Sequence, residues 1–94
     1  MAVYLISYDL NKSGKDYKGV YEAIKASSVG GNTWWHYLDS TWIIKSNLSV
    51  QQVYEKIRLH TDSDDFFLVI EVKNNKQGWL PQDAWDYLNN VIFS

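Results

Sequence analysis

Asp9, His36 and Asp39 are the residues of this chain whose types suggest chemistry. A carboxylate can hold Mg²⁺, which accepts one or two protein carboxylates and completes its shell with water. Such an ion can generate the hydroxide that attacks a phosphodiester and stabilise the leaving oxygen. Asp9 is therefore a candidate catalytic and metal-binding residue with Mg²⁺ as its cofactor. The alternative is structural: Asp9 ends a strand and caps the turn at Asn11.

His36 is a candidate general base, because histidine titrates near neutral pH. Asp39 follows it by three residues in a segment that we expect to be extended. Residues i and i+3 of a strand point to opposite faces, so the two side chains cannot form a local pair unless the strand bends. We therefore expect a structural or surface histidine. The residues provide no complete catalytic set, which favours a binding protein over an enzyme.

The run Trp34–Trp42 contains three of the five tryptophans, together with Tyr37. Tryptophan and tyrosine combine a large apolar area with a polar group and are enriched in binding surfaces. Exposed rings on a sheet can stack on the bases of a nucleotide or of single-stranded RNA. Core packing and a dimer interface are the alternatives, since so small a domain needs many of its rings inside. The candidate ligand-binding residues are Tyr8, Asn11, Trp34, Trp35, His36, Tyr37, Asp39 and Trp42.

Length and composition restrict the class of protein. The 94 residues, 46% of them hydrophobic, suffice for one domain over residues 1–94. A net charge of −2 argues against tight binding of duplex DNA, which requires a basic surface. The absence of cysteine fits a reducing, cytoplasmic location. The apolar runs are short and interrupted by charges, so we expect no membrane span.

The periodicity of apolar residues predicts the elements that position these residues. Residues 3–8, 33–38, 41–45 and 66–73 are typical of strands. A helix is expected from Asp16 to the glycines at 30 and 31, with Gly19 as a weak point inside it. A second helix runs to about Leu59 and begins at a capping box of Ser49 and Gln52. A short terminal helix begins at Pro81.

The order strand, helix, strand, strand, helix, strand, helix predicts an α+β fold. Specifically, it predicts a ferredoxin-like βαββαβ sandwich with an antiparallel sheet and a short C-terminal helix. Its two main helices cover one face of the sheet. The other face must be exposed to solvent, or covered by the C-terminal segment or by a partner. An exposed pair, Phe67 and Val69, would make a homodimer the economical way to cover it.

Three segments carry a resemblance to short bacterial and phage proteins labelled SinR-like. They are Tyr4–Asn11, Trp34–Trp42 and the sequence Gly-Trp-Leu-Pro at 78–81. The chain is also similar, in its expected topology and in Asp9, to the group of CRISPR-associated protein two and VapD. That wider resemblance implies a homodimer and a metal-dependent endoribonuclease or phosphodiesterase that uses Asp9. A non-enzymatic phage or host interaction protein is a third alternative.

Overall fold

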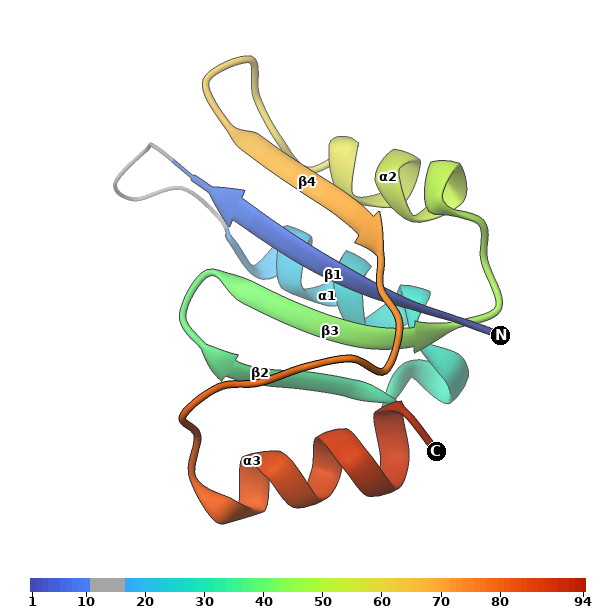
Figure 1. The fold of residues 1–94 in the computed structure, drawn as a ribbon. Helices are drawn as coiled ribbons and strands as arrows, with labels where there is room; N and C mark the ends of the chain where they lie inside the picture. Colours follow the sequence, from blue (N-terminus) through green and yellow to red (C-terminus); the bar gives the residue numbers. More distant parts are fainter. Residues whose placement is uncertain (11–16) are drawn as a thin grey trace.

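The four strand-like runs of the sequence form one antiparallel sheet in the computed structural model, which describes residues 1–10 and 17–94. The elements are β1 (Ala2–Asp9), α1 (Tyr17–Ser27), β2 (Trp34–Leu38), β3 (Thr41–Ser46), α2 (Val50–Arg58), β4 (Phe66–Glu71) and α3 (Gln82–Tyr87). A 3₁₀ turn over Val29–Gly31 and a π-helical turn over Leu88–Ile92 were not expected from the sequence. The α+β class and the antiparallel sheet are confirmed (Figure 1).

The strands lie in the order β2-β3-β1-β4, and each neighbouring pair is antiparallel. β1 is central: Ile6 lies opposite Trp42 of β3 on one side and Val69 of β4 on the other. This position explains why β1 is a nearly continuous apolar run. β4 and β2 are the two edges of the described sheet.

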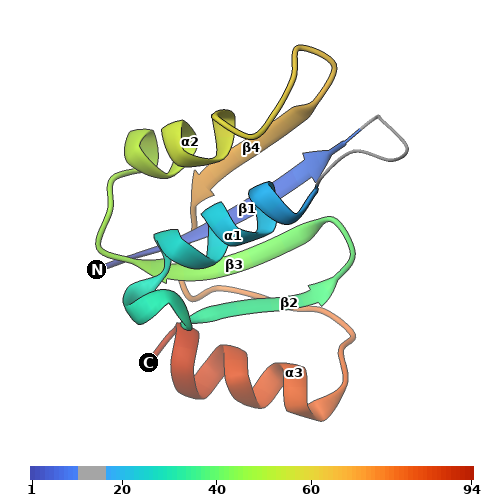
Figure 2. The ribbon, with the colours of Figure 1, turned by 180° about the vertical axis from the view of Figure 1, so that it is seen from behind.

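Helices α1 and α2 cover one face of the sheet (Figure 2). Side chains that alternate along β1 and β3 point into this layer, since neighbouring residues of a strand face opposite ways. The helices contribute the apolar stripes of their inner faces. The buried members of this main core are Tyr4, Ile6, Val20, Ala23, Ile24, Trp42, Ile44, Val53 and Ile57.

The C-terminal segment covers part of the opposite face. Residues 72–81, which we call the strap, leave β4, cross in front of the sheet and lead into α3 beside β2 (Figure 1). Trp35, Ala84, Leu88 and Ile92 form a second buried cluster there. Of the three possibilities for this face, cover by the C-terminal segment is therefore present, over the half formed by β2 and β3.

The expectation that Phe67 and Val69 are exposed is wrong. Both are partly buried against the main core, while Leu68 and Ile70 point to the other face and are exposed. β4 alternates as expected, but periodicity alone does not say which of its two apolar faces meets the helices. Packing against α2 decides it, and Phe67 stacks on Tyr54 with ring centroids 5.5 Å apart.

The predicted capping box begins α2. The Ser49 hydroxyl accepts from the backbone N–H of Gln52 at 3.2 Å, and the Gln52 side chain accepts from the Ser49 N–H at 2.8 Å. These bonds satisfy two N–H groups that a helix start leaves without partners. Leu48, which precedes the cap, packs against the main core. The start of α2 is thus encoded locally.

Gly19 in α1 has a packing role that its helix propensity does not reveal. A Cβ at this position would lie 2.5 Å from Nδ1 of His60, in the turn after α2. The missing side chain therefore allows the turn after α2 to approach α1 closely. Glycine at position 19 leaves room for the His60 ring.

We expect Gly19→Ala to stabilise the protein by about 1 kcal/mol, the gain in helix propensity, only when His60 is also alanine. In the natural background the new methyl must push the His60 ring away, which cancels part or all of that gain. Urea unfolding of both single variants and the double variant measures this coupling. An equal effect of Gly19→Ala in both backgrounds would contradict the packing role.

Candidate functional site

The tryptophan run divides between the two faces of the sheet. Trp34 lies 5.1 Å from Trp42, ring to ring, on the face covered by α1. Trp35 lies 5.4 Å from Tyr37 on the face covered by α3. Trp35 and Trp42 are each 2% exposed. These two rings therefore belong to two separate cores, and Trp34 is the half-buried tryptophan of the run.

Leu38 departs from the strict alternation that the sequence predicts. The pairing of β2 with β3 shifts register between Trp35 and Leu38, as at a β-bulge. In a regular strand Leu38 would lie on the face of Trp34 and His36, but it lines a cavity together with Trp35 and Ile43. The extra residue in β2 moves it to the other face.

A cluster of rings and hydroxyls surrounds Trp42 on the face of α1. The His36 ring stacks on the Trp42 ring at 3.9 Å and 13°. Trp42 Nε1 donates to the Tyr8 hydroxyl at 3.0 Å, and that hydroxyl donates to the carbonyl of Asp39 at 3.3 Å. Burial raises the pKa of Tyr8 to about 12, against the smaller opposing effect of the bond from Trp42. The phenol stays protonated and serves as a structural link between β1 and the β2–β3 turn.

His36 and Asp39 do approach each other, because the bulge bends the strand between them. The contact joins His36 Nε2 to the backbone carbonyl of Asp39 at 2.9 Å, and the carboxylate is not part of it. A carbonyl only accepts, so Nε2 carries the proton. A histidine held in this way fixes the turn and does not reproduce an aspartate–histidine base.

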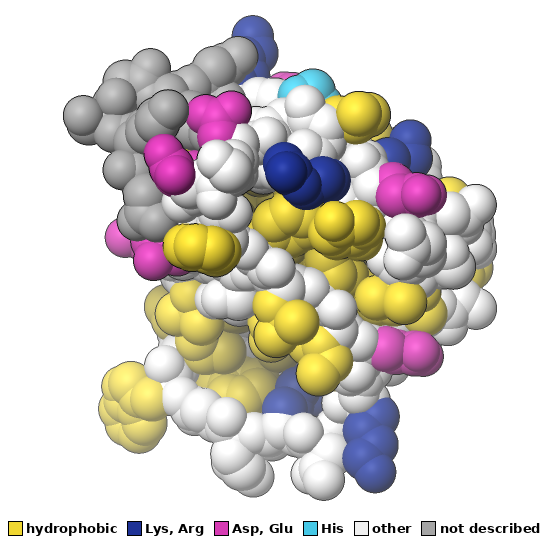
Figure 3. All heavy atoms as spheres, turned by 90° about the horizontal axis from the view of Figure 1, so that it is seen from above, with side chains coloured by type: hydrophobic (Ala, Val, Ile, Leu, Met, Phe, Trp, Pro, Cys, Tyr) yellow, Lys and Arg dark blue, Asp and Glu magenta, His cyan; other side chains and the backbone are white. Residues whose placement is uncertain are grey.

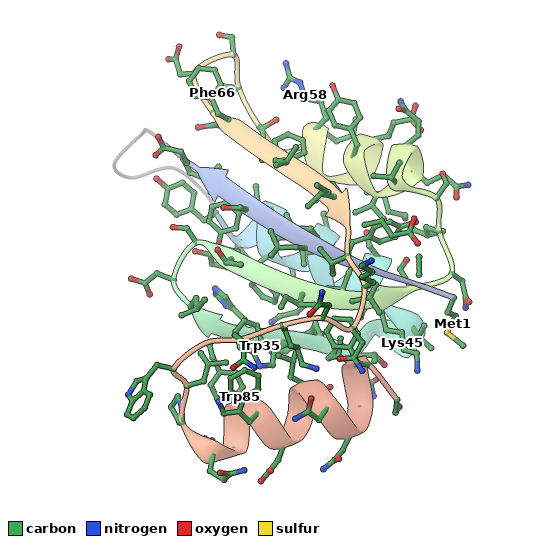
Figure 4. All side chains as sticks on the ribbon, viewed as in Figure 1. Met1, Trp35, Lys45, Arg58, Phe66 and Trp85 are labelled. Carbon is green, nitrogen blue, oxygen red and sulfur yellow. The ribbon has the colours of Figure 1, made fainter. Side chains whose placement is uncertain are left out.

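Trp35 connects β2 to the C-terminal helix. Its Nε1 donates to the carbonyl of Ala84 at 3.0 Å, and Trp85 lies close to it between β2 and α3 (Figure 4). Tyr37 donates to the carboxylate of Asp83 at 3.4 Å, and its pKa is raised by desolvation and by that carboxylate. The two aromatic residues on this face thus hold α3 against the sheet.

Asp9 lies at the exposed end of β1, opposite Phe66 of β4. Together with Asp39 and Tyr17 it lines a polar pocket of about 280 Å³. Among residues 1–10 and 17–94, no three His, Asp or Glu side chains gather as a metal-binding group would. Mg²⁺ is satisfied by one or two protein carboxylates with water, so Asp9 and Asp39 suit it by type. Asn11, the remaining candidate, lies outside the described residues.

An exposed apolar surface lies where neither the strap nor α3 covers the sheet. Phe66, Leu68 and Ile70 are 65%, 58% and 47% exposed and alternate along one face of β4. We call these three residues the open face. Hydrophobic side chains gather across the middle of the molecule when it is viewed from the β4 side (Figure 3). Phe66 projects from the start of the strand (Figure 4).

The sequence did not reveal two exposed apolar features of the molecule. The available signal for the open face was that β4 is apolar on both faces, which indicates burial on both. Trp79 of the strap is 99% exposed, and its signal was its place in the Gly-Trp-Leu-Pro segment. Single exposed apolar residues are ordinary, but contiguous groups of large ones mark interaction sites.

We compared the chain with protein-family models, curated proteins and solved structures, and none of the three comparisons found a match. The resemblance to the SinR-like proteins and to the wider nuclease group therefore stays a prediction. Within residues 1–10 and 17–94, no helix has both the length and the apolar character needed to cross a membrane.

Proposed function

We propose that this chain is a small, non-enzymatic binding protein that acts as a homodimer and uses its apolar sheet surface to bind protein. The observation that supports this proposal is the exposure of the open face. Leaving Phe66, Leu68 and Ile70 in water forgoes the stabilisation of about 25 cal/mol per Å² that burial gives. Side chains of a partner that pack beside these three recover part of that free energy.

The position of the open face favours a second copy of the chain as a partner. β4 is an edge strand, and β1 is its one neighbour among the described strands. It has no proline or lysine, the usual protections of an exposed edge. Antiparallel pairing of two β4 strands about Leu68 places Phe66 of each copy beside Ile70 of the other. Such an arrangement is self-complementary, as a two-fold interface requires.

We propose also that the fold is ferredoxin-like. The support is the element order together with the strand order β2-β3-β1-β4, in which β1 separates β3 from β4 and β3 separates β1 from β2. Two interleaved βαβ units produce this order. α3 and the strap are then additions that cover half of the face left free by the two main helices.

Recognition of a nucleotide or oligonucleotide fits the surface less well. Trp35 and Trp42 have no accessible ring face, and Lys25 Nζ already lies over the ring of Trp34, 5.0 Å from its centroid. Stacking of a base on Trp34 would have to displace this cation–π contact. We therefore place protein binding ahead of base stacking.

Sedimentation equilibrium tests the proposal. We expect the natural protein to dimerise and Leu68→Lys to remain monomeric, because two like charges then meet at the symmetry axis. Leu59→Lys is the matched control, since Leu59 is 83% exposed at the end of α2, which packs on the opposite face of the sheet from the open face (Figure 2). A natural protein that is monomeric at every concentration, or a Leu68→Lys dimer, would contradict the proposal.

A magnesium-dependent ribonuclease is the second candidate, and the position of Asp9 favours it. Asp9 lies opposite Phe66, so a dimer formed through the open face has an Asp9 of each copy at its margin. The assay is cleavage of single-stranded RNA with Mg²⁺, comparing the natural protein, Asp9→Asn and the control Asp86→Asn on α3. Loss of cleavage in Asp9→Asn alone supports this candidate, while equal rates in all three would attribute the cleavage to a contaminant.

A further inference from the structure

A cavity of about 500 Å³ lies between the strap and the sheet, on the face of Trp35. Sites for small organic ligands usually measure about 300–1,000 Å³ and are mostly apolar with a few polar groups. Residues of three strands, the strap and α3 line it, so distant parts of the chain build it jointly. We call it the strap pocket. It is separate from the open face, and no residue of the open face lines it.

Aromatic and aliphatic side chains form most of the wall of the strap pocket. Trp35 and Ile43 come from the sheet, Trp85 from α3, and Phe93 from the chain beyond the π-helical turn. Trp35 and Trp85 lie close together between β2 and α3, as Figure 4 shows. Flat rings on several sides suit a ligand with an apolar aromatic or aliphatic body.

The charges of the strap pocket have one sign. Its charged lining residues are Lys73 and Lys76, and neither Asp nor Glu is among the described residues that line it. This composition contrasts with the net charge of −2 of the whole chain. The Nζ of Lys76 lies 4.7 Å from the centroid of the Phe93 ring, which holds an ammonium group against the apolar wall. The carboxylate of Asp83 on α3 is not among the lining residues, and it accepts from Tyr37.

We propose that the strap pocket binds an amphipathic organic anion, a carboxylate or sulfonate with an aromatic or medium-length aliphatic body. The body lies between the rings, and the anionic group meets Lys73 and Lys76. The side-chain amides of Asn75 and Gln77, which also line the pocket, supply neutral donors beside the lysines. An ion pair next to apolar walls is screened less than one in open water.

Two fluorescent probes with the same ring system separate the charge from the apolar body. 8-Anilinonaphthalene-1-sulfonate carries a sulfonate, and N-phenyl-1-naphthylamine lacks it. We expect the double variant Lys73→Gln/Lys76→Gln to bind the sulfonate about tenfold more weakly and the neutral probe within about twofold of the natural protein. Lys56→Gln on α2 is the control and should change neither affinity. Decanoate should displace the sulfonate probe more effectively than decanol.

Filling the pocket gives a second, independent measurement. A Cβ at Gly78 would lie 3.8 Å from Cζ2 of Trp85, an ordinary contact, so a larger side chain there points toward the pocket wall. We expect Gly78→Leu to bind both probes more weakly and Gly78→Ala to bind them as the natural protein does. Circular dichroism confirms that each variant is folded.

Leu68→Lys distinguishes the strap pocket from the open face, and we expect it to leave probe binding unchanged. Sulfonate affinity that survives in the double lysine variant would overturn the charge assignment. Unchanged binding to Gly78→Leu would overturn the site itself. Loss of the sulfonate probe from Leu68→Lys alone would mean that it binds at the open face, which overturns this inference and leaves the proposed homodimer to its own test.

Discussion

Replacing Trp42 by alanine is expected to lower the free energy of unfolding by about 3–5 kcal/mol. The indole is 2% exposed, stacks on His36 and donates to the Tyr8 hydroxyl, so its loss leaves a cavity and removes one of the two hydrogen bonds of that hydroxyl. A domain of this length has a total stability of about 5–14 kcal/mol. The variant should therefore lose much of that stability, and its entire sheet should unfold together.

Urea unfolding followed by far-ultraviolet circular dichroism measures this effect. Trp79→Ala is the matched control, because it removes the same side chain from a position that is 99% exposed. We expect that control to change stability by less than about 0.5 kcal/mol. Similar losses in the two variants would mean that Trp42 is not the centre of the main core.

Replacing Trp35 by alanine is expected to remove as much packing as Trp42→Ala does, but to unfold a different part of the molecule. Trp35 is the largest buried member of the second cluster, and its Nε1 donates to the carbonyl of Ala84 in α3. α3 has six residues, and so short a helix is not stable in water without tertiary contacts. We therefore expect residues 82–92 to leave the sheet before the rest of the domain unfolds.

Hydrogen exchange of the backbone amides distinguishes the two tryptophan variants. In Trp35→Ala, amides of α3 should exchange far faster while those of β1 change less. In Trp42→Ala, α3 and β1 should lose protection together. Trp35→Phe keeps a ring but removes the N–H donor, so it should lie between the natural protein and the alanine variant. Full protection of α3 in Trp35→Ala would show that the second cluster does not depend on this ring.

The features that the sequence predicts correctly are those with local causes. Ser49 and Gln52 are three residues apart, and a capping box needs nothing further. The alternation of Trp34, Trp35, His36 and Tyr37 follows from the pleat of a strand. The separation of His36 from the Asp39 carboxylate agrees with the same geometry, although a bulge brings His36 to the Asp39 carbonyl.

The features that the sequence does not predict depend on which surfaces meet. Phe67 and Leu68 are equally apolar in the sequence, and contact with α2 decides that Phe67 is covered and Leu68 exposed. The position of Gly19 inside a helical pattern suggests a weak point in that helix. The close approach of the His60 ring gives Gly19 a packing role as well. Leu38 changes faces because the pairing of β2 with β3 includes a bulge, which no local pattern indicates.

The tryptophan run contains both kinds of feature, those with local causes and those that depend on tertiary contacts. The sequence by itself determined that its rings point to two faces, because side chains of a strand alternate with a period of two. Only the tertiary structure decided that Trp42 lies under α1 and that Trp35 lies under α3. It also left the three open-face residues of β4, and Trp79 of the strap, far more exposed than Trp35 and Trp42. The reason is physical: periodicity is a property of neighbouring residues, whereas burial depends on contacts between residues far apart in the chain.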